Sequence, residues 1–319
     1  MFSVIMPAYN AESCVAAAIS SVLRQHCGDF ELIIVNDGSA DHTQEVIDTF
    51  KDPRIRCLRQ ENAGVSAARN RGILAGSGEY VCFLDADDTW RENHLEELSA
   101  LIREYPDCGM YITGYDIRLQ GGAVLHRSEE LLKNVPQRHF ESRNGYDMLL
   151  QHGYFFNTNT LCCKREVFDR VGLFQEGVTH AEDDDMWFRI FAYYSIAVSK
   201  EVTTIYDRSN STATATRVLF ENVFRKRVDA LLASPLVPDD RKASLRIWCQ
   251  RNTLSLSRRY LLAGNKPRAW TLLRTVDVGS VSKRKYLETI LCMLVPTRLI
   301  VRHIDRRDRA YYRRVVKIK

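Results

Sequence analysis

The chain has 319 residues, of which 45% are hydrophobic and 27% charged, with 16 Gly and 8 Pro. These proportions are those of a globular protein, and they exclude a disordered, collagen-like or multi-span membrane protein. A chain of this length forms one large domain or two smaller ones, with enough core to need no disulfide or metal for stability. The 9 cysteines include no CxxC pair, and no signal-length apolar stretch opens the chain, so we expect reduced thiols and a cytoplasmic protein.

The net charge of +5 is divided unevenly along the chain. Residues 1–216 contain 20 Lys and Arg against 32 Asp and Glu, whereas residues 217–319 contain 25 against 8. We therefore place a domain boundary at residue 216, at the end of a small polar segment where the composition changes. An acidic part suits a cation-assisted site, and a basic part suits the phosphates of a nucleic acid or of anionic lipid head groups.

Short apolar runs alternate with helical periods through the first 110 residues. The predicted strands are residues 4–6, stopped by Pro7, and residues 31–35, 55–58 and 80–84. The predicted helices between them are residues 11–25, 41–50 and 66–75. Continuous apolar strands separated by such helices predict an α/β fold, with a mostly parallel sheet that has helices on both faces.

The chain is less regular from residue 110 to residue 216. We predict strands at residues 111–119 and 158–163, a hairpin turn at Gly121-Gly122 and a helix at residues 182–193. Residues 129–140 show no period and are expected to form a mobile loop. The rest of the chain predicts helices, over residues 217–233, 240–263, 267–276, 283–293 and 297–315.

No transmembrane helix is predicted. The most apolar stretch, residues 287–301, is interrupted by Pro296 and Arg298. It falls short of the ~20 apolar residues that a helix needs to span a bilayer.

Polar residues stand at the carboxyl ends of all four predicted strands, where ligands bind in a doubly wound sheet. The four segments are Pro7-Ala-Tyr-Asn10, Asn36-Asp-Gly-Ser39, Glu61-Asn-Ala-Gly64 and Asp85-Ala-Asp-Asp88. A single Asp at such a place is usually a helix cap or a turn residue. Four polar ends in succession on one edge are more than turns require, so the edge predicts a binding site.

The segment Asp85-Ala-Asp87-Asp88 places three carboxylates within four residues. Like charges this close repel each other unless a cation neutralises them, and hard oxygen ligands suit Mg²⁺ or Mn²⁺. Such an ion completes its shell with water and substrate phosphates, so we expect a diphosphate-bearing substrate. In the alternative interpretation, Asp88 or Thr89 caps the helix that starts near Arg91. The chain has no GxGxxG or P-loop pattern, which argues against dinucleotide or P-loop binding.

Asp37 ends a buried predicted strand, and two interpretations of it stay open. Its carboxylate can accept a hydrogen bond from the imide N–H of uracil or from a ribose hydroxyl, with Tyr9 as a stacking face nearby. Asp37-Gly38 is also a frequent turn pair, which makes Asp37 a turn residue.

Four acidic residues start the predicted helix in Ala181-Glu-Asp-Asp-Asp-Met-Trp187. The helix dipole favours acids at this end and accounts for two or three of them. Asp183 precedes Met186 by three residues and Trp187 by four, which places it at the edge of the predicted buried stripe. Partial desolvation there would raise the pKa of its carboxyl group, and this suits a general base.

Five separated segments occur in the order and spacing of a known family. They are Val4-Ile-Met-Pro-Ala-Tyr-Asn10, Val35-Asn-Asp-Gly-Ser39, Ser66-Ala-Ala-Arg-Asn70, Leu84-Asp-Ala-Asp-Asp88, and Glu182-Asp183 followed by Trp187. On these residues the sequence resembles the family-2 inverting glycosyltransferases, especially bacterial enzymes that build surface polysaccharides. The likeness covers about residues 2–212. It implies the GT-A fold, a Rossmann-like, mostly parallel sheet, followed by the basic helical region of residues 217–319.

The resemblance also implies a role for each matching residue. The nucleotide base and ribose would be held by residues at the first strand ends, with two residues of the next helix nearby: Pro7, Ala8, Tyr9, Asn10 and Asp37, then Arg69 and Asn70. Asp85 and Asp87 would be the DXD pair, with Asp85 toward the ribose or metal and Asp87 as the principal ligand of Mn²⁺ or Mg²⁺. Asp183 would be the catalytic base, and Glu182 would orient it or contact the acceptor. Arg208 would approach the diphosphate.

The implied reaction moves a sugar from a nucleotide diphosphate sugar to a hydroxyl of a saccharide or lipid-linked acceptor. UDP is the expected nucleotide, with dTDP and GDP as alternatives. A nucleic-acid-binding protein would explain the basic region but not the polar strand ends. A sugar nucleotidyltransferase would need a Gly-rich basic loop near its N-terminus, which Pro7-Ala-Tyr-Asn10 does not resemble.

The last predicted helix mixes cationic and apolar residues. Its cationic residues are Arg302, Arg306, Arg307, Arg309, Arg313 and Arg314. Such a helix suits an anionic membrane surface, and the protein would then be peripheral at the inner face of the plasma membrane. In the alternative interpretation, the basic helices pack on the acidic part and expose ordinary solvated charge.

Overall fold

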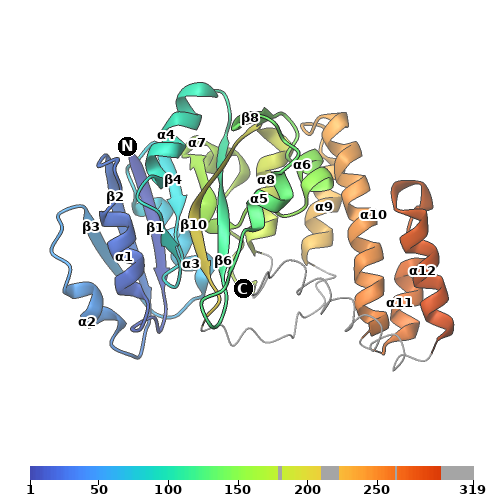
Figure 1. The fold of residues 1–319 in the computed structure, drawn as a ribbon, viewed down its shortest axis with the longest axis horizontal. Helices are drawn as coiled ribbons and strands as arrows, with labels where there is room; N and C mark the ends of the chain where they lie inside the picture. Colours follow the sequence, from blue (N-terminus) through green and yellow to red (C-terminus); the bar gives the residue numbers. More distant parts are fainter. Residues whose placement is uncertain (179–181, 210–222, 263, 296–319) are drawn as a thin grey trace.

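The structure is a computed structural model that describes residues 1–178, 182–209, 223–262 and 264–295 (Figure 1). One mixed sheet has the strand order β3-β2-β1-β4-β9-β6-β10-β5, with β7 paired to β6 and β8 to β10. The strands are β1 (Phe2–Ala8), β2 (Phe30–Asp37), β3 (Ile55–Gln60), β4 (Tyr80–Phe83), β5 (Thr89–Trp90), β6 (Met110–Arg118), β7 (Val124–Leu125), β8 (His139–Ser142), β9 (Leu161–Lys164) and β10 (Ile196–Asp207). The α-helices of the sheet part are α1 (Val15–Leu23), α2 (Thr43–Asp48), α3 (Val65–Ala75), α4 (His94–Glu104), α5 (Arg127–Leu132), α6 (Gly145–His152), α7 (Glu166–Val171) and α8 (Glu182–Tyr193).

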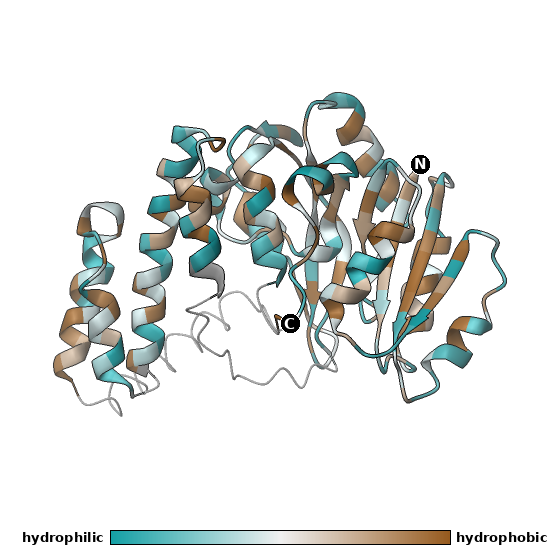
Figure 2. Ribbon diagram, turned by 180° about the vertical axis from the view of Figure 1, so that it is seen from behind, coloured by the Kyte–Doolittle hydropathy of each residue, from teal (hydrophilic) through white to brown (hydrophobic). Residues whose placement is uncertain are grey.

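The first four strands form a parallel part of the sheet, in which β1, β2 and β4 are buried on both faces and β3, at the edge, is only partly buried. β1 pairs in parallel with β2 and β4, and β2 pairs in parallel with β3. Side chains alternate between the faces: Val4 and Met6 of β1 join the core under α1 and α4, whereas Ile5 joins the core under α3 and α8. Figure 2 shows these strands as largely hydrophobic. The predicted α/β class, with helices on both faces, is confirmed.

The prediction that the first strand stops before Pro7 is wrong, because β1 continues to Ala8. Ile5 is the last residue of β1 that has a partner in β4, whereas Pro7 is paired only with Val35 of β2. β1 is therefore an edge on its β4 side at Pro7, and such a position tolerates a residue without an N–H group.

The second half of the sheet is mixed. β9 lies between β4 and β6 and is antiparallel to both, whereas β10 is parallel to β6. The strand predicted at residues 158–163 begins as a short 3₁₀ turn, Thr158–Thr160, and becomes extended only in β9. The loop expected at residues 129–140 is shorter than predicted: residues 133–138 have no regular structure, whereas the end of α5 and the start of β8 occupy the rest. Both elements are too short to show a period, and pairing of β8 with β10 stabilises the strand.

The C-terminal helices are α9 (Val223–Ala233), α10 (Asp239–Leu262), α11 (Lys266–Leu273) and α12 (Lys283–Leu294). They stand at one end of the molecule, beyond α8 (Figure 1). The predicted boundary at residue 216 and the helix predicted at residues 297–315 lie outside the described residues. Val228 and Leu245 belong to the same buried cluster as Phe188 of α8, so α9 and α10 share a core with the sheet. Within the described residues, no helix combines the length and the apolar character that crossing a bilayer requires.

Candidate active site

The residues after β1 and β2 form one wall of the candidate site. Tyr9 is 53% exposed, whereas Ala8 before it is buried. Asn10 has a φ of 49°, a left-handed conformation that Asn tolerates better than most residues. Its Oδ1 accepts a hydrogen bond from the N–H of Ala40 at 2.9 Å, and its own N–H donates to Oγ of Ser39 at 3.1 Å. Asn10 therefore ties the two loops together and leaves the Tyr9 ring open to a ligand.

Asp37 is buried at the end of β2 and organises the loop after β3. Its carboxylate accepts hydrogen bonds from Nε2 of Gln60 at 2.7 Å and from the N–H groups of Ala63 and Gly64, both at 2.9 Å. Gly38 allows this close approach, because its φ is +73° and a Cβ atom there would lie 2.7 Å from the backbone N of Asn62. The structure thus gives Asp37 a turn-organising role, and its contact with a base or ribose stays a prediction.

The acidic segment after β4 divides into two kinds of carboxylate. Asp88 is fully buried; it accepts hydrogen bonds from Nδ2 of Asn159 and, at 2.7 Å, from the N–H of Asp207. Burial, and then the charges of Asp85 and Asp87, raise the pKa of Asp88 to about 9. Asp87 is exposed at the surface of the same segment. Partial desolvation by surrounding protein atoms, and then the charge of Asp85, raise the pKa of Asp87.

Asn159 is a site residue that the sequence analysis missed. Its Oδ1 accepts a hydrogen bond from the N–H of Asp85 at 2.7 Å, while its Nδ2 donates to Asp88. One side chain therefore fixes the backbone and a carboxylate of the acidic segment from the 3₁₀ turn before β9. The polar run Asn157-Thr-Asn-Thr160 was the only signal in the sequence.

The end of β10 brings another acid and the predicted Arg208 to this side of the sheet. The N–H of Asp207 donates to Asp88, and its carboxylate forms an ion pair with Nη1 of Arg118 at 2.9 Å. Arg208 is exposed, and its guanidinium lies 5.9 Å from the centre of the Tyr206 ring. Asp207 adds negative charge near Asp87 and Asp88. Arg208 was predicted from the sequence as a site residue, whereas Asp207 was not.

Arg69 connects the acidic segment to the start of α8. It is buried in α3, and its Nη2 donates to Oδ1 of Asp85 at 2.8 Å. Its Nη1 lies 3.6 Å from Oε1 of Glu182. Burial lowers the pKa of Arg69, but the charges of Asp85, Asp183 and Glu182 outweigh it and raise that pKa overall. The guanidinium therefore stays charged between the two acidic groups that the sequence predicted as one site.

Asp183 and Glu182 lie together at the start of α8. Asp183 accepts hydrogen bonds from the N–H of Asp184 at 2.8 Å and, at the long distance of 3.5 Å, from Oγ1 of Thr158. Burial, and then the charge of Asp183, raise the pKa of Glu182. With two donors, one of them distant, the carboxylate of Asp183 can still accept a hydrogen bond from a ligand hydroxyl.

Asn70 holds a loop instead of pointing its amide at the acidic residues. Its Nδ2 donates to O of Phe174 and to Oε1 of Glu176, both at 2.9 Å, and its Oδ1 accepts from the N–H of Phe174 at 2.8 Å. A role of Asn70 in donor binding stays a prediction.

The acidic segment fits a divalent cation. Asp87 forms no side-chain hydrogen bond or ion pair with another described residue, and its pKa is raised by partial desolvation and then by the negative charge of Asp85. Among the described residues, no group of three or more His, Cys, Asp or Glu has metal-binding geometry. Asp85 and Asp87 would supply one or two carboxylate ligands. Mg²⁺ and Mn²⁺ bind in this manner when phosphates and water complete the shell. Asp85 and Asp87 are the residues that would hold such an ion.

The chain is similar in sequence to known glycosyltransferases. The family model described as glycosyl transferase family 2 matches residues 3–172. The chain is 33% identical over 198 residues to the uncharacterized glycosyltransferase EpsJ of Bacillus subtilis, which covers 57% of this chain and 54% of EpsJ. It is 42% identical over 105 residues to WfgD of Escherichia coli, a UDP-Glc:alpha-D-GlcNAc-diphosphoundecaprenol beta-1,3-glucosyltransferase, over 32% of this chain and 42% of WfgD.

Solved structures share the fold at low sequence identity. The crystal structure of Staphylococcus aureus TarS 1–349 in complex with UDP-GlcNAc superposes with a TM-score of 0.66 and 19% identity, over 89% of this chain and 82% of that one. The mannosyltransferase PcManGT of Pyrobaculum calidifontis, in complex with GDP-Man and Mn²⁺, has a TM-score of 0.56 and 18% identity, over 94% and 82%. These likenesses establish the fold alone. The curated relatives are matched over about half of their own lengths.

Proposed function

Because the chain belongs to glycosyl transferase family 2, we propose that it moves a sugar from a nucleotide diphosphate sugar to an acceptor hydroxyl, with inversion at the anomeric carbon. One observation carries this proposal. Arg69 lies between Asp85 and Glu182, at 2.8 and 3.6 Å, and so joins the predicted donor-binding residues to the predicted catalytic helix. A single substrate can then contact both groups.

Asp183 supplies the base in the proposed reaction. An acceptor hydroxyl is a poor nucleophile at neutral pH, so Asp183 takes its proton as the oxygen attacks the anomeric carbon. The attack comes from the face opposite the diphosphate, and the bond to the diphosphate breaks with its electron pair staying on the leaving oxygen. A divalent ion bound at Asp85 and Asp87 would neutralise the negative charge that grows there. Arg208 is exposed at the end of β10, and we assign it a supporting contact with the diphosphate.

The relatives support a class of donor and acceptor. The TarS complex contains UDP-GlcNAc, which supports a UDP-sugar donor. The name of WfgD describes an acceptor carried on diphosphoundecaprenol, which supports a lipid-linked acceptor in bacterial polysaccharide synthesis. A lipid-linked acceptor would place the protein at the inner face of the plasma membrane. Family membership favours a transferase over a nucleic-acid-binding protein or a sugar nucleotidyltransferase.

Two substitutions test the roles in the proposed site. We expect Asp183→Asn to abolish transfer while nucleotide-sugar binding is kept, because the amide preserves shape but cannot take a proton. We expect Asp87→Ala to abolish transfer and to remove the effect of Mn²⁺ on binding. Transfer is measured as nucleotide diphosphate release with a panel of UDP-sugars, and binding is measured as a ligand-induced rise in Tm.

Asp107→Asn is the matched control, because Asp107 is an exposed acid in the loop before β6, at the other end of that strand from Asp207 and its neighbours. It should leave both readouts unchanged. Turnover by Asp183→Asn at the rate of the unsubstituted protein would remove Asp183 from the base role.

A further inference from the structure

The outermost helix of the described chain, α12, exposes a row of large apolar side chains. Leu287 is 58% exposed, Leu291 is 61% exposed and Leu294 is 79% exposed. Their spacing of four and then three residues places them on one face of the helix, and we call them the leucine stripe. In Figure 2 the half of this helix next to the grey C-terminal trace is strongly hydrophobic.

The leucine stripe is not needed to hold α12 in place. The opposite face of the helix carries Tyr286, Thr289, Ile290 and Met293, which are buried or partly buried, and three of them pack with Leu254 and Leu273 of α10 and α11. Folding therefore uses one face of α12 and leaves three leucines in water. An exposed apolar row of this kind marks an interaction surface.

The charges around the leucine stripe indicate what it contacts. Lys283, Arg284 and Lys285 are exposed in the first turn of α12. Lys283 and Arg284 precede Leu287 by four and three residues, so they share its face. Glu288 is the acid beside them, and its carboxylate is paired with Nε of Arg284 at 3.0 Å. The face therefore presents Lys283 and the Arg284–Glu288 ion pair, with a net positive charge, at one end and leucines along the rest.

Two protein partners, a second copy of the chain and the segment after α12, match the charge of this face poorly. A second copy of the chain in an isologous contact would bring the same cations together if the two helices were parallel, and would place them against the exposed leucines if the helices were antiparallel. The segment that follows α12, residues 296–319, contains 9 Lys and Arg against 2 Asp and Glu, so it would also place positive charge against positive charge. An anionic surface with an apolar interior matches both features of the face.

We propose that the leucine stripe is a membrane-docking surface that inserts into the acyl boundary of an anionic bilayer. Leu287, Leu291 and Leu294 enter the apolar layer, while Lys283 and Arg284 contact the head-group phosphates. α12 then lies in the plane of the membrane and attaches the enzyme to it. The surface is distinct from the site around Asp85 and Asp183, so this inference does not depend on the proposed reaction.

Flotation of the full chain with lipid vesicles tests the docking surface. The vesicles are phosphatidylcholine alone and phosphatidylcholine mixed with phosphatidylglycerol. The variant is Leu287→Ser/Leu291→Ser/Leu294→Ser, which leaves every charge in place. We expect the unsubstituted chain to float with the anionic vesicles only, and the triple variant to partition at least about tenfold more weakly, because apolar burial and charge act together.

A double variant at other exposed leucines is the matched control. Leu74 and Leu236 are 72% and 68% exposed and lie in α3 and in the turn before α10, so Leu74→Ser/Leu236→Ser should float like the unsubstituted chain. Lys283→Gln/Arg284→Gln should weaken flotation and lower its sensitivity to salt. Far-UV circular dichroism and nucleotide-sugar binding verify that each variant is folded.

Three results would overturn the proposal. The triple variant could float as well as the unsubstituted chain, which would assign any membrane binding to other residues. The unsubstituted chain could fail to float with anionic vesicles. Sedimentation without lipid could instead show a dimer that the triple variant loses, which would make a second copy the occupant of the leucine stripe.

Discussion

Arg69 shows how a single buried cation organises an acidic site. Without it, the carboxylates of Asp85, Glu182 and Asp183 would meet in a poorly solvated place, where like charges repel strongly. Its Nη2 is paired with Asp85, while its Nη1 lacks a hydrogen bond of good geometry and is 3.6 Å from Glu182. Arg69 thus has unused donor capacity that faces the acids of α8. A bound diphosphate or acceptor would be a partner for it.

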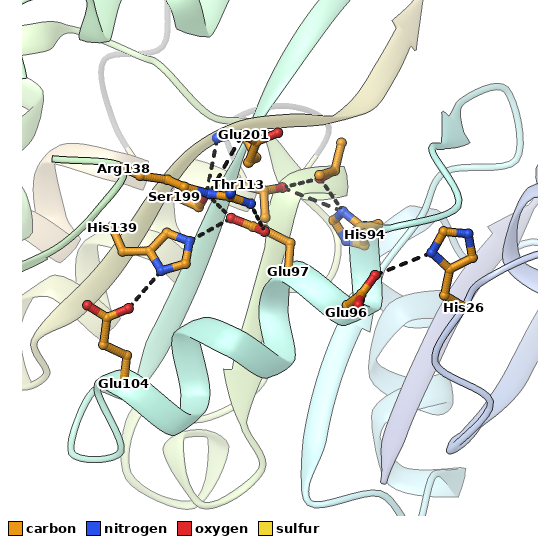
Figure 3. Close-up of polar contacts among 11 residues, drawn as sticks. His26, His94, Glu96, Glu97, Glu104, Thr113, Arg138, His139, Ser199 and Glu201 are labelled. Carbon is orange, nitrogen blue, oxygen red and sulfur yellow. Dashed lines mark hydrogen bonds and ion pairs between the residues drawn. The ribbon is translucent and has the colours of Figure 1, made fainter.

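His94 is a buried histidine that the proposed reaction does not use. Its Nδ1 is 2.7 Å from Oγ1 of Thr203, its ring stacks on Trp90 at 4.0 Å, and it lies beside Thr113 (Figure 3). Burial lowers the pKa of His94 to about 3. Glu97, on the same helix, has its own partners, Arg138, His139 and Ser199. His94 is therefore neutral in the folded protein at pH values well above 3.

The free energy of unfolding should decrease as the pH is lowered, because of His94. Between its folded pKa of about 3 and the ordinary value of 6.5, the unfolded chain binds a proton at His94 that the folded chain does not. Stability from this group is complete above pH 6.5 and is lost as the pH falls, by about 1.4 kcal/mol per pH unit. We expect His94→Asn to show a pH slope that is shallower by this amount between about pH 4.5 and 6, measured by urea unfolding.

Thr203→Val is the control for this slope. It removes the hydrogen bond to Nδ1 but leaves the imidazole buried, so its absolute stability should fall while the pH slope is kept. Equal slopes for His94→Asn and the unsubstituted protein would show that His94 takes up a proton without unfolding.

The helix α8, which carries Glu182 and Asp183, is anchored by an ion pair that crosses to the C-terminal helices. Asp185 is buried and accepts from Nε of Arg189 at 3.0 Å and from Nε of Arg227 of α9 at 2.8 Å. Arg189 also donates to backbone carbonyl groups at residues 171–173, at the end of α7 and just after it. The start of α8 is therefore held from two sides. Asp185, which the sequence grouped with the other acids of this helix, is structural.

Removal of Arg227 should loosen this anchor. We expect Arg227→Gln to lower the free energy of unfolding by about 1.5–3 kcal/mol, because a buried charged acceptor loses one donor. The transfer rate should fall as well, since Asp183 precedes Asp185 by two residues. Arg284→Gln is a matched control, because Arg284 and Glu288 form an exposed i,i+4 pair, worth about 0.5 kcal/mol or less. Equal losses in the two variants would contradict the anchor.

The elements that the sequence predicted are those with local signals. β1 to β4 are short apolar runs followed by polar ends, and α8 has a clear buried stripe, so each could be recognised from its own residues. β9 was also predicted, as the end of a strand at residues 158–163, but its place between β4 and β6 could not be predicted, because that place depends on partners such as Cys82 and Tyr111, far away in the sequence. Asn159 was missed for the same reason, since it meets Asp85 across 74 residues. Clustered acidic residues could be recognised in the sequence, whereas the neutral side chains that hold them by hydrogen bonds, such as Asn159, could not.

The division of charge along the chain does not coincide with a division of the core. Residues 217–319 are strongly basic, yet Val228, Leu231 and Leu245 are buried in one cluster with Phe188 of the sheet part. The ring of Trp248 lies edge-on to Phe188, with centroids 4.5 Å apart. The farther helices, α11 and α12, pack in small clusters around Leu254 and Leu261 of α10. α9 and α10 are therefore a layer of the sheet part, whereas α11 and α12 contact the rest of the protein through α10.

This shared core predicts that the sheet and α10 unfold together. Leu245 is fully buried, so we expect Leu245→Ala to cost about 2–5 kcal/mol and to lower the urea midpoint equally by far-UV circular dichroism and by tryptophan fluorescence. The exposed Leu236 is the control, and Leu236→Ala should change stability by less than about 0.5 kcal/mol. If Leu245→Ala instead produced an early transition in the helical signal, with nucleotide-sugar binding intact at that urea concentration, α9 and α10 would form an independent unit. The anchor between Asp185 and Arg227 would then join two domains and not two layers of one.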